Sequence, residues 1–197
     1  AGRVESLRAF PSGVDRHAVQ PPAPGAGTSS LSAADADGNL VAVTLTHGSW
    51  LGSLLTVPEA GITLGHGMCR FDPRPGGPNS VGPRKRPLNN MCPTILRLPD
   101  RDVACGNRGG RRIVNVVTQL CRRFVDLNSS GLAAVSAPRV HVETQEPVAG
   151  AKIVGELRAM GHDIRLVPAV AGPANAVERL ARGSLRGASN VSAVAVS

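Results

Sequence analysis

The chain has 197 residues, a formal net charge of +8 at pH 7 and only 2% aromatic residues. That length is enough for one domain with a sizeable core, which must be built from Ala, Val, Leu and Ile. The basic residues are scattered in short clusters and stacking aromatics are nearly absent, which argues against a nucleic-acid partner. We expect the excess charge to pair with a more acidic partner chain or to attract an anionic substrate.

The cysteines and histidines do not indicate a metal site. The four cysteines, at positions 69, 92, 105 and 121, form no C-x-x-C pair, and the five histidines show no ligand spacing. We therefore expect no metal, no cofactor and no disulfide framework, and read the histidines as surface or loop residues, with His47 and His66 as weaker pocket candidates. No stretch reaches the ~18 apolar residues of a membrane span, and no signal peptide opens the chain. Free thiols favour a reducing compartment, so we expect a cytoplasmic protein.

A hairpin is the strongest local prediction. Residues 3–10 have helical apolar spacing, and residues 11–27 are Pro/Gly/Ala-rich, which is typical of an extended linker. A strand-like run then opens at Thr28, and a second runs back over residues 40–46. The turn between them, residues 37–39, is Asp-Gly-Asn, and Gly readily takes the positive φ that such a turn needs.

The rest of the chain alternates loops, strands and helices. The helix predicted at about 111–126 is the clearest, because its apolar residues fall on one face. Hairpins followed by helices favour a layered α+β fold. The expected elements are a loop with a short strand or turn at 47–60, a surface loop at 72–87, strands at 94–98, 103–106, 140–143, 163–167 and 185–189, a turn at 99–102, and helices at 111–126, 130–136 and 148–160.

An ordered series of short motifs resembles the small, catalytic subunit of the γ-glutamyltransferase (γ-glutamyltranspeptidase) family. They are the Thr28–Thr46 hairpin, Leu51-Gly52-Ser53, Gly61-Ile62-Thr63-Leu64, Met68 before Phe71, Lys85-Arg86-Pro87-Leu88, Met91-Cys92-Pro93-Thr94-Ile95, and Gly109-Gly110 before Arg112-Ile113. The resemblance spans most of the chain, residues 28–190. It implies an N-terminal-nucleophile (Ntn) hydrolase with a four-layer αββα sandwich, completed by a large-subunit partner in a heterodimer.

The resemblance also implies a cleavage site and catalytic groups. Residues 1–27 would be the tail of the large subunit and a linker, and residues 28–197 the small subunit, released by self-cleavage between Gly27 and Thr28. Ala1 cannot be the nucleophile, so either this bond is intact or the sequence joins two pieces. In free Thr28 the hydroxyl would attack an acyl carbon while the α-amine, titrating near ~7.7–8, accepts the proton.

Three other residues have implied catalytic roles. Thr46 matches the family threonine that hydrogen-bonds the nucleophile. Gly109 and Gly110, after a strand and before a helix, match the family's oxyanion hole, where backbone N–H groups converge.

The substrate pocket departs from the family pattern. Arg70 stands where γ-glutamyl enzymes carry an Asp that pairs with the substrate ammonium, and Gly67 and Gly48 replace a Gln and an Asn of the same subsite. An Arg suits a carboxylate and would repel an ammonium. Asn89 and Asn90 replace two Ser that hold the substrate carboxylate, and can still donate through their amides.

The sequence thus predicts an Ntn-type hydrolase or acyltransferase that cleaves an amide or carbon–carbon acyl bond of a small anionic substrate, in specialised metabolism. Two alternatives stay open: a true γ-glutamyl transferase or hydrolase of glutathione-like substrates, and an unprocessed, inactive homologue that acts as a binding protein.

Overall fold

The structure of the protein is a computed structural model that describes residues 27–49, 51–143, 146–149, 151–162, 165–166 and 172–190. The helix predicted at 3–10 and the linker up to residue 26 lie outside these residues. None of the helices within the described ranges is long and apolar enough to cross a membrane.

The predicted hairpin is confirmed. Strand β1 (Thr28–Ala34) pairs antiparallel with β2 (Leu40–Thr46), in a register that sets Thr28 opposite Thr46. In the turn, Gly38 has a φ of 96°. The Asp35 carboxylate accepts hydrogen bonds from the backbone N and the Nδ2 of Asn39, and these bonds hold the pKa of Asp35 below its usual value.

A four-stranded antiparallel sheet forms the centre of the molecule. Its strand order is β11 (Leu185–Ser189), β10 (Ala174–Leu180), β6 (Arg101–Asn107) and β5 (Thr94–Arg97). The predicted strands at 94–98 and 185–189 are confirmed. The predicted turn at 99–102 is too long, because β6 already begins at Arg101.

Two helices cover one face of this sheet. Helix α2 (Arg112–Val125) packs on β6, and α3 (Gly131–Ser136) packs on β10 and β11. The apolar face predicted for α2 is the buried one, and with β6, β10, β11 and α3 it makes the core, which consists of Val103, Cys105, Val116, Leu120, Phe124, Ala134, Val135, Ala174, Ala176 and Ala188.

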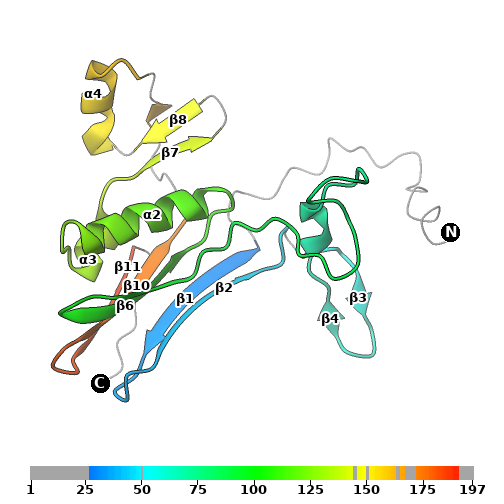
Figure 1. Ribbon diagram of the computed structural model, residues 1–197, viewed down its shortest axis with the longest axis horizontal. Coiled ribbons are helices and arrows are strands. Elements are labelled where there is room, and N and C mark those ends of the chain that lie inside the picture. Colours follow the sequence, from blue (N-terminus) through cyan, green and yellow to red (C-terminus); the bar gives the residue numbers. More distant parts are fainter. Residues whose placement is uncertain are drawn as a thin grey trace, which may run out of the picture.

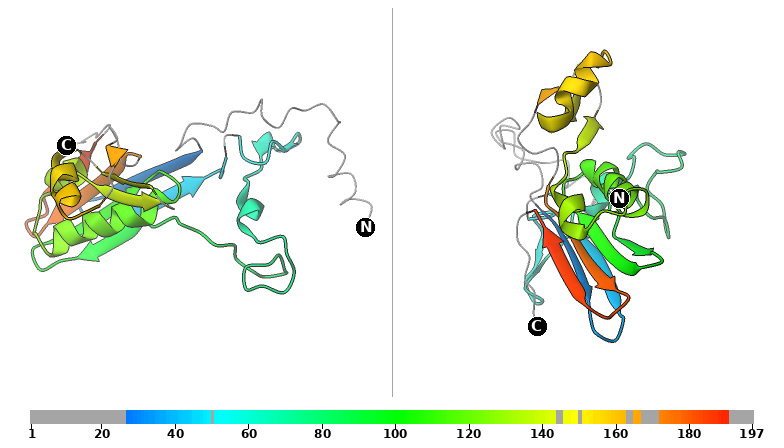
Figure 2. Two further views of the ribbon diagram at one scale, coloured as in Figure 1. Left: turned by 90° about the horizontal axis from the view of Figure 1, so that it is seen from above. Right: turned by 90° about the vertical axis from the view of Figure 1, so that its left-hand side faces the viewer.

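The hairpin lies on the other face, so the described residues form three layers: hairpin, sheet and helices (Figures 1 and 2). The contact between hairpin and sheet is polar and close. Ser32 Oγ donates to Asn175 Oδ1 at 2.6 Å, and Asn175 Nδ2 donates to Ser30 Oγ at 3.0 Å. Gly106 permits this approach, since a Cβ there would lie 2.5 Å from Ser30 Oγ.

Smaller elements flank these layers. The hairpin of β3 (Thr56–Val57) and β4 (Ile62–Thr63) and the short 3₁₀ helix η1 (Gly67–Arg70) lie beyond the Thr28 end of β1 in both views (Figures 1 and 2). A separate sheet holds β7 (Val140–Glu143), β8 (Glu146–Ala149) and β9 (Arg165–Leu166), next to α4 (Ala151–Ala159).

Two predicted bounds in this last region change. The helix predicted at 148–160 begins three residues later, because residues 148–149 pair with β7 as part of β8. Of the strand predicted at 163–167, residues 165–166 form β9, and the others lie outside the described residues.

Candidate active site

Two threonine hydroxyls meet at the open end of the hairpin. Thr28 Oγ1 and Thr46 Oγ1 are 2.8 Å apart, because their strands pair at this position. Thr46 Oγ1 also donates to the carbonyl oxygen of Gly27 at 3.0 Å and accepts from the backbone N of Gly48 at 2.9 Å. A hydroxyl has one proton, and that of Thr46 is engaged by Gly27, so Thr28 is the donor within the threonine pair.

The carbonyl oxygen of Gly27 receives two hydrogen bonds. Besides the Thr46 hydroxyl, the backbone N of His47 donates to it at 2.8 Å. Gly27 has a φ of 97°, a backbone conformation that favours glycine. No side-chain motif indicates the His47 donor, although the register of a hairpin centred on Asp37 sets His47 opposite Gly27.

Strand register brings the other predicted catalytic groups to the same end of the molecule. The hairpin turn lies over the far end, since a Cβ on Gly38 would be 3.3 Å from Cζ of Arg179. Ser30 lies over Gly106, near the end of β6. The Thr28 end of the hairpin therefore points toward the segment that follows β6, which contains Gly109 and Gly110.

The Gly109–Gly110 turn leads directly into α2. Gly109 and Gly110 have φ values of 144° and 62°, and their carbonyls accept from the backbone N of Arg112 and Ile113. Neither glycine donates its own N–H to another described residue. Space for a side chain is limited at Gly109, where a Cβ would lie 3.1 Å from the backbone N of Gly172. These two N–H groups are available donors at a helix N-terminus.

A serine–histidine contact lies next to the threonine pair. The Ser49 hydroxyl donates to the Gly52 carbonyl at 2.6 Å, so the contact of 3.2 Å between Ser49 Oγ and His66 Nδ1 requires that the imidazole donates. Neutral His66 then keeps Nε2 as an acceptor. A Cβ on Gly48 would lie 3.3 Å from the Cβ of His66, so this histidine occupies the space beside Gly48.

Of the predicted substrate-binding residues, Gly48 contacts the threonine pair through its backbone N–H, and the other three lie near this end without a hydrogen bond to it. Among the described residues, no hydrogen bond joins Arg70, Asn89 or Asn90 to Thr28 or Thr46. Arg70 closes η1, and Asn89 and Asn90 precede β5, whose first residue pairs with β6 near the Gly109 end. The Nδ2 of Asn90 is buried and has no hydrogen-bond partner among the described residues.

The structure corrects the prediction that all five histidines are surface or loop residues. His141 is not a surface residue: it lies in β7 with 4% of its surface exposed, and its Nδ1 is 3.2 Å from Asn115 Nδ2 of α2. Within the described ranges, no group of three or more His, Cys, Asp or Glu side chains could hold a metal ion.

The described residues thus combine two stacked sheets, a helix layer and a threonine pair at the start of a strand. The family model described as γ-glutamyltranspeptidase matches residues 3–195. The chain is 33% identical over 147 residues to the glutathione hydrolase proenzyme of Bacillus subtilis and 34% identical over 169 residues to the acylase ACY 1 proenzyme of Pseudomonas sp. strain SE83, covering 72% and 83% of this chain. The chain belongs to the γ-glutamyltranspeptidase family of Ntn hydrolases.

Solved structures agree with this assignment. The T380A mutant of γ-glutamyltranspeptidase from Helicobacter pylori superposes with a TM-score of 0.70 at 31% identity, covering 83% of this chain and 98% of that one. The chain spans only 25% of the Bacillus subtilis proenzyme and 30% of the Pseudomonas acylase proenzyme. It corresponds to one part of a longer precursor in these relatives.

Proposed function

We propose that the protein cleaves itself between Gly27 and Thr28 and then hydrolyses or transfers an acyl group through Thr28. The observation that carries this proposal is the arrangement around the Gly27–Thr28 bond. The Thr28 hydroxyl donates to Thr46, and two donors hold the Gly27 carbonyl oxygen, one from Thr46 and one from His47.

Self-cleavage follows from this arrangement in two steps. Thr28 Oγ1 attacks the Gly27 carbonyl carbon, and the negative charge that develops on the oxygen is stabilised by the Thr46 hydroxyl and the His47 N–H. The C–N bond breaks, the α-amine of Thr28 takes the proton, and an ester joins Gly27 to Thr28. Water then hydrolyses the ester, which leaves a Gly27 carboxylate and a free Thr28 with its α-amine.

The released Thr28 would then act on substrate. Its hydroxyl attacks the acyl carbon, its α-amine carries the proton to the leaving group, and water or another acceptor resolves the acyl-enzyme. The available N–H groups of Gly109 and Gly110 serve the oxyanion of this second reaction, at the N-terminal end of α2.

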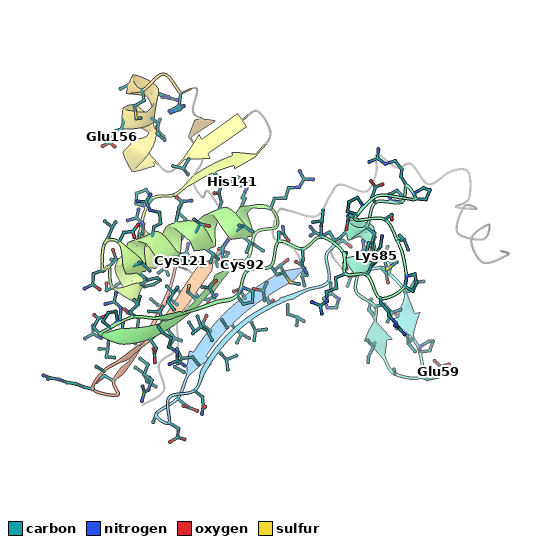
Figure 3. The ribbon with its side chains drawn as sticks, in the orientation of Figure 1. Glu59, Lys85, Cys92, Cys121, His141 and Glu156 are labelled. Atoms are coloured by element: carbon teal, nitrogen blue, oxygen red, sulfur yellow. The ribbon has the colours of Figure 1, made fainter. Side chains whose placement is uncertain are left out.

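A small substrate with an anionic acyl group fits the surroundings best. Between residues 47 and 71 the sequence has one acidic residue, Glu59, and between 84 and 98 and between 103 and 125 it has none. Glu59 lies at the tip of the β3–β4 hairpin (Figure 3). The same segments carry Arg70, and the Asn90 amide adds an unpaired donor. Such a site attracts carboxylates and offers little to an ammonium group.

A large subunit from the same precursor is the proposed partner. The outward face of the hairpin exposes the apolar side chains Leu31, Val41, Val43 and Leu45, and α helices cover only the opposite side of the described sandwich. A further layer on this face would complete a four-layer αββα sandwich. The shortness of the chain relative to its proenzyme relatives supports this assembly.

Mass and N-terminal sequence of the purified full-length protein test the first half of the proposal. We expect a chain that begins at Thr28, and we expect Thr28→Ala to remain a single chain without turnover. Ser29→Ala, one residue away on the exposed face of β1, is the control and should process normally. A wild-type protein that never releases Thr28 would contradict the proposal and favour a binding protein.

Two chromogenic anilides test the substrate class. Glutaryl-p-nitroanilide and γ-glutamyl-p-nitroanilide differ only in the α-ammonium of the second. We expect kcat/KM to be at least about 10-fold higher for the glutaryl compound, which corresponds to about 1.4 kcal/mol of transition-state binding, and Arg70→Ala to remove this preference. The reverse preference would support the second candidate, a γ-glutamyl enzyme. The name of the Bacillus subtilis relative, a glutathione hydrolase proenzyme, favours that candidate.

A further inference from the structure

Asn107 is a fully buried polar residue beside the Gly109–Gly110 turn. It is the last residue of β6, and none of its surface is exposed. Side chains alternate along a strand, so Asn107 is on the same face of β6 as Val103 and Cys105, which belong to the core shared with α2. The hairpin covers the other face, at Gly106. Asn107 therefore approaches the turn from the helix side, opposite the hairpin.

The side-chain amide of Asn107 makes no hydrogen bond inside the protein. Neither its Oδ1 nor its Nδ2 has a partner among the described residues. An amide buried in this way costs free energy, and native proteins seldom keep one without a use for it. Such breaks in otherwise consistent packing are typical of functional sites. The amide is therefore a candidate for a role in function and not in stability.

The nitrogen end of this amide faces the Gly109–Gly110 turn. A Cβ on Gly109 would lie 3.7 Å from Asn107 Nδ2 and 3.1 Å from the backbone N of Gly172, so nitrogen atoms from two parts of the chain approach Gly109. Helix α2, which follows the turn, adds the positive end of its dipole. The sequence has no acidic residue between positions 103 and 125. The surroundings of the turn thus favour negative charge on it.

We propose that Asn107 stabilises the oxyanion of acyl transfer from behind the Gly109–Gly110 turn. This role rests on the function proposed above, in which the N–H groups of both glycines bind that oxyanion. When the Thr28 hydroxyl adds to the acyl carbon, the π electrons of the C=O bond move to the oxygen, which becomes negative. The Asn107 dipole has its positive end toward Gly109 and lowers the energy of this charge without touching it. Its effect is large for its distance, because a buried site screens the field little and the dipole is already oriented.

Self-cleavage should not need Asn107. Its oxyanion would form on the Gly27 oxygen, which already has the Thr46 hydroxyl and the His47 N–H as donors. The two reactions that we assign to Thr28 thus use different sets of donors. Loss of the Asn107 amide should slow only the second reaction, the turnover of substrate.

Replacement of the amide by a branched apolar side chain tests this role in the purified full-length protein. Asn107→Leu should release Thr28 at the wild-type rate and lower kcat for the better of the two anilides by about 10-fold, at an unchanged KM. The midpoint of denaturant unfolding should not fall, since the change removes two unpaired polar atoms. Val103→Ala, fully buried on the same face of β6, is the control. It should show the opposite pattern, a lower midpoint with the wild-type kcat.

Asn107→Ala adds no volume and replaces Asn107→Leu if that variant does not fold, with kcat against the rate of self-cleavage as the readout. A kcat within about twofold of the wild type in the folded variant would overturn the role of the amide. So would equal slowing of self-cleavage and turnover, or a lowered midpoint in Asn107→Leu, since both are the pattern of a structural residue. A wild-type protein that releases no Thr28, or hydrolyses neither anilide, would instead contradict the proposed function itself.

Discussion

Thr46 is the residue on whose side chain the candidate site depends most. It contacts Thr28, the Gly27 carbonyl and the Gly48 backbone N at 2.8, 3.0 and 2.9 Å, so one oxygen atom contacts both the proposed nucleophile and the bond that we propose is cleaved. Its hydrogen-bonding capacity as a hydroxyl is fully used, with one donated and two accepted bonds. A methyl group in its place would break all three contacts without changing the volume of the side chain much.

We therefore expect Thr46→Val to slow self-cleavage by at least about 10²-fold, the usual effect of losing one oxyanion donor. The measurement is the fraction of precursor chain over time after purification. Thr44→Val is the matched control: it lies on the same strand and the same face, and its buried Oγ1 has no hydrogen-bond partner among the described residues. Normal processing in Thr46→Val, or equal slowing in both variants, would contradict the role of the hydroxyl.

The Asn90 amide provides a second prediction at this scale. A buried N–H group without a partner is costly in the free protein, and a substrate carboxylate would satisfy it. We expect Asn90→Ala to lower kcat/KM for glutaryl-p-nitroanilide by about 10-fold and to leave self-cleavage unchanged. For Asn89→Ala the loss should be smaller, because the Asn89 Oδ1 serves a local turn by accepting from the Met91 backbone N. An unchanged KM and kcat in Asn90→Ala would remove this amide from the site.

At the scale of elements, a buried ion pair connects the sheet to α3. Arg101 Nε of β6 lies 3.2 Å from Glu178 Oε1 of β10, and Glu178 Oε2 accepts from the backbone N of Gly131 at 2.8 Å. Gly131 is the first residue of α3, and its backbone N–H has no acceptor within the helix. The Glu178 carboxylate supplies that acceptor. Both charged side chains are less than 10% exposed, which makes the loss of either one expensive.

Glu178→Gln should lower the free energy of unfolding by about 3 kcal/mol, because it removes the buried carboxylate beside the Arg101 guanidinium and leaves that charge only its ion pair with the exposed Asp100. Denaturant titration of the wild type and the variant measures this difference. Glu156→Gln on α4, whose side chain is exposed, is the control and should change stability little. A Glu178→Gln variant within about 0.5 kcal/mol of the wild type would show that the pair adds nothing to stability.

Strands and helices with a regular turn or apolar pattern were predictable from the sequence. Strands whose buried face also holds small or charged residues were not. The hairpin followed from its Asp-Gly turn, and α2 from five apolar residues on one face. Strand β10 was missed because its buried positions hold two alanines and Glu178, so its inward face does not read as apolar. Strand β8 was not predicted, because its residues 148–149 also fit the helical apolar spacing of the residues that follow.

The candidate site was predictable only through resemblance. Composition and spacing make Thr28 an ordinary strand residue, and the resemblance to the γ-glutamyltranspeptidase family singled out Thr28 and Thr46 as a pair. The structure brings these two hydroxyls together. The His47 donor could not be found by side-chain motifs, because the group is a backbone N–H. His141 was misread because its burial depends on α2, which is distant in the sequence.

At the scale of the whole molecule, the described residues expose a large apolar area on the hairpin. Leu31 and Leu45 are 52% and 67% exposed, and Val43, opposite Leu31, and Val41 lie on the same face. Contiguous apolar faces of this kind are typical of surfaces that a partner covers. The proposed partner is the preceding part of the precursor.

We expect Leu45→Asp in the full precursor to weaken the association of the two processed chains, because a carboxylate would be buried without a counter-charge. Size-exclusion chromatography of the processed protein measures whether both chains elute together. Leu132→Asp, at an equally exposed position on α3 in the helix layer, is the control and should leave the complex intact. Unchanged co-elution of the Leu45→Asp chains would show that this face is not the interface.

The two donors on the Gly27 oxygen have a consequence that lasts beyond the cleavage itself. In the proposed cleavage, residue 27 becomes a carboxylate next to the Thr46 hydroxyl and the His47 N–H, which now hold its carbonyl oxygen. The tail would then be an anionic product, kept at high local concentration beside a pocket proposed to suit anions. We therefore expect maturation to consist of two events, cleavage of the bond and departure of the tail. Turnover should lag behind the appearance of free Thr28 until the tail has withdrawn.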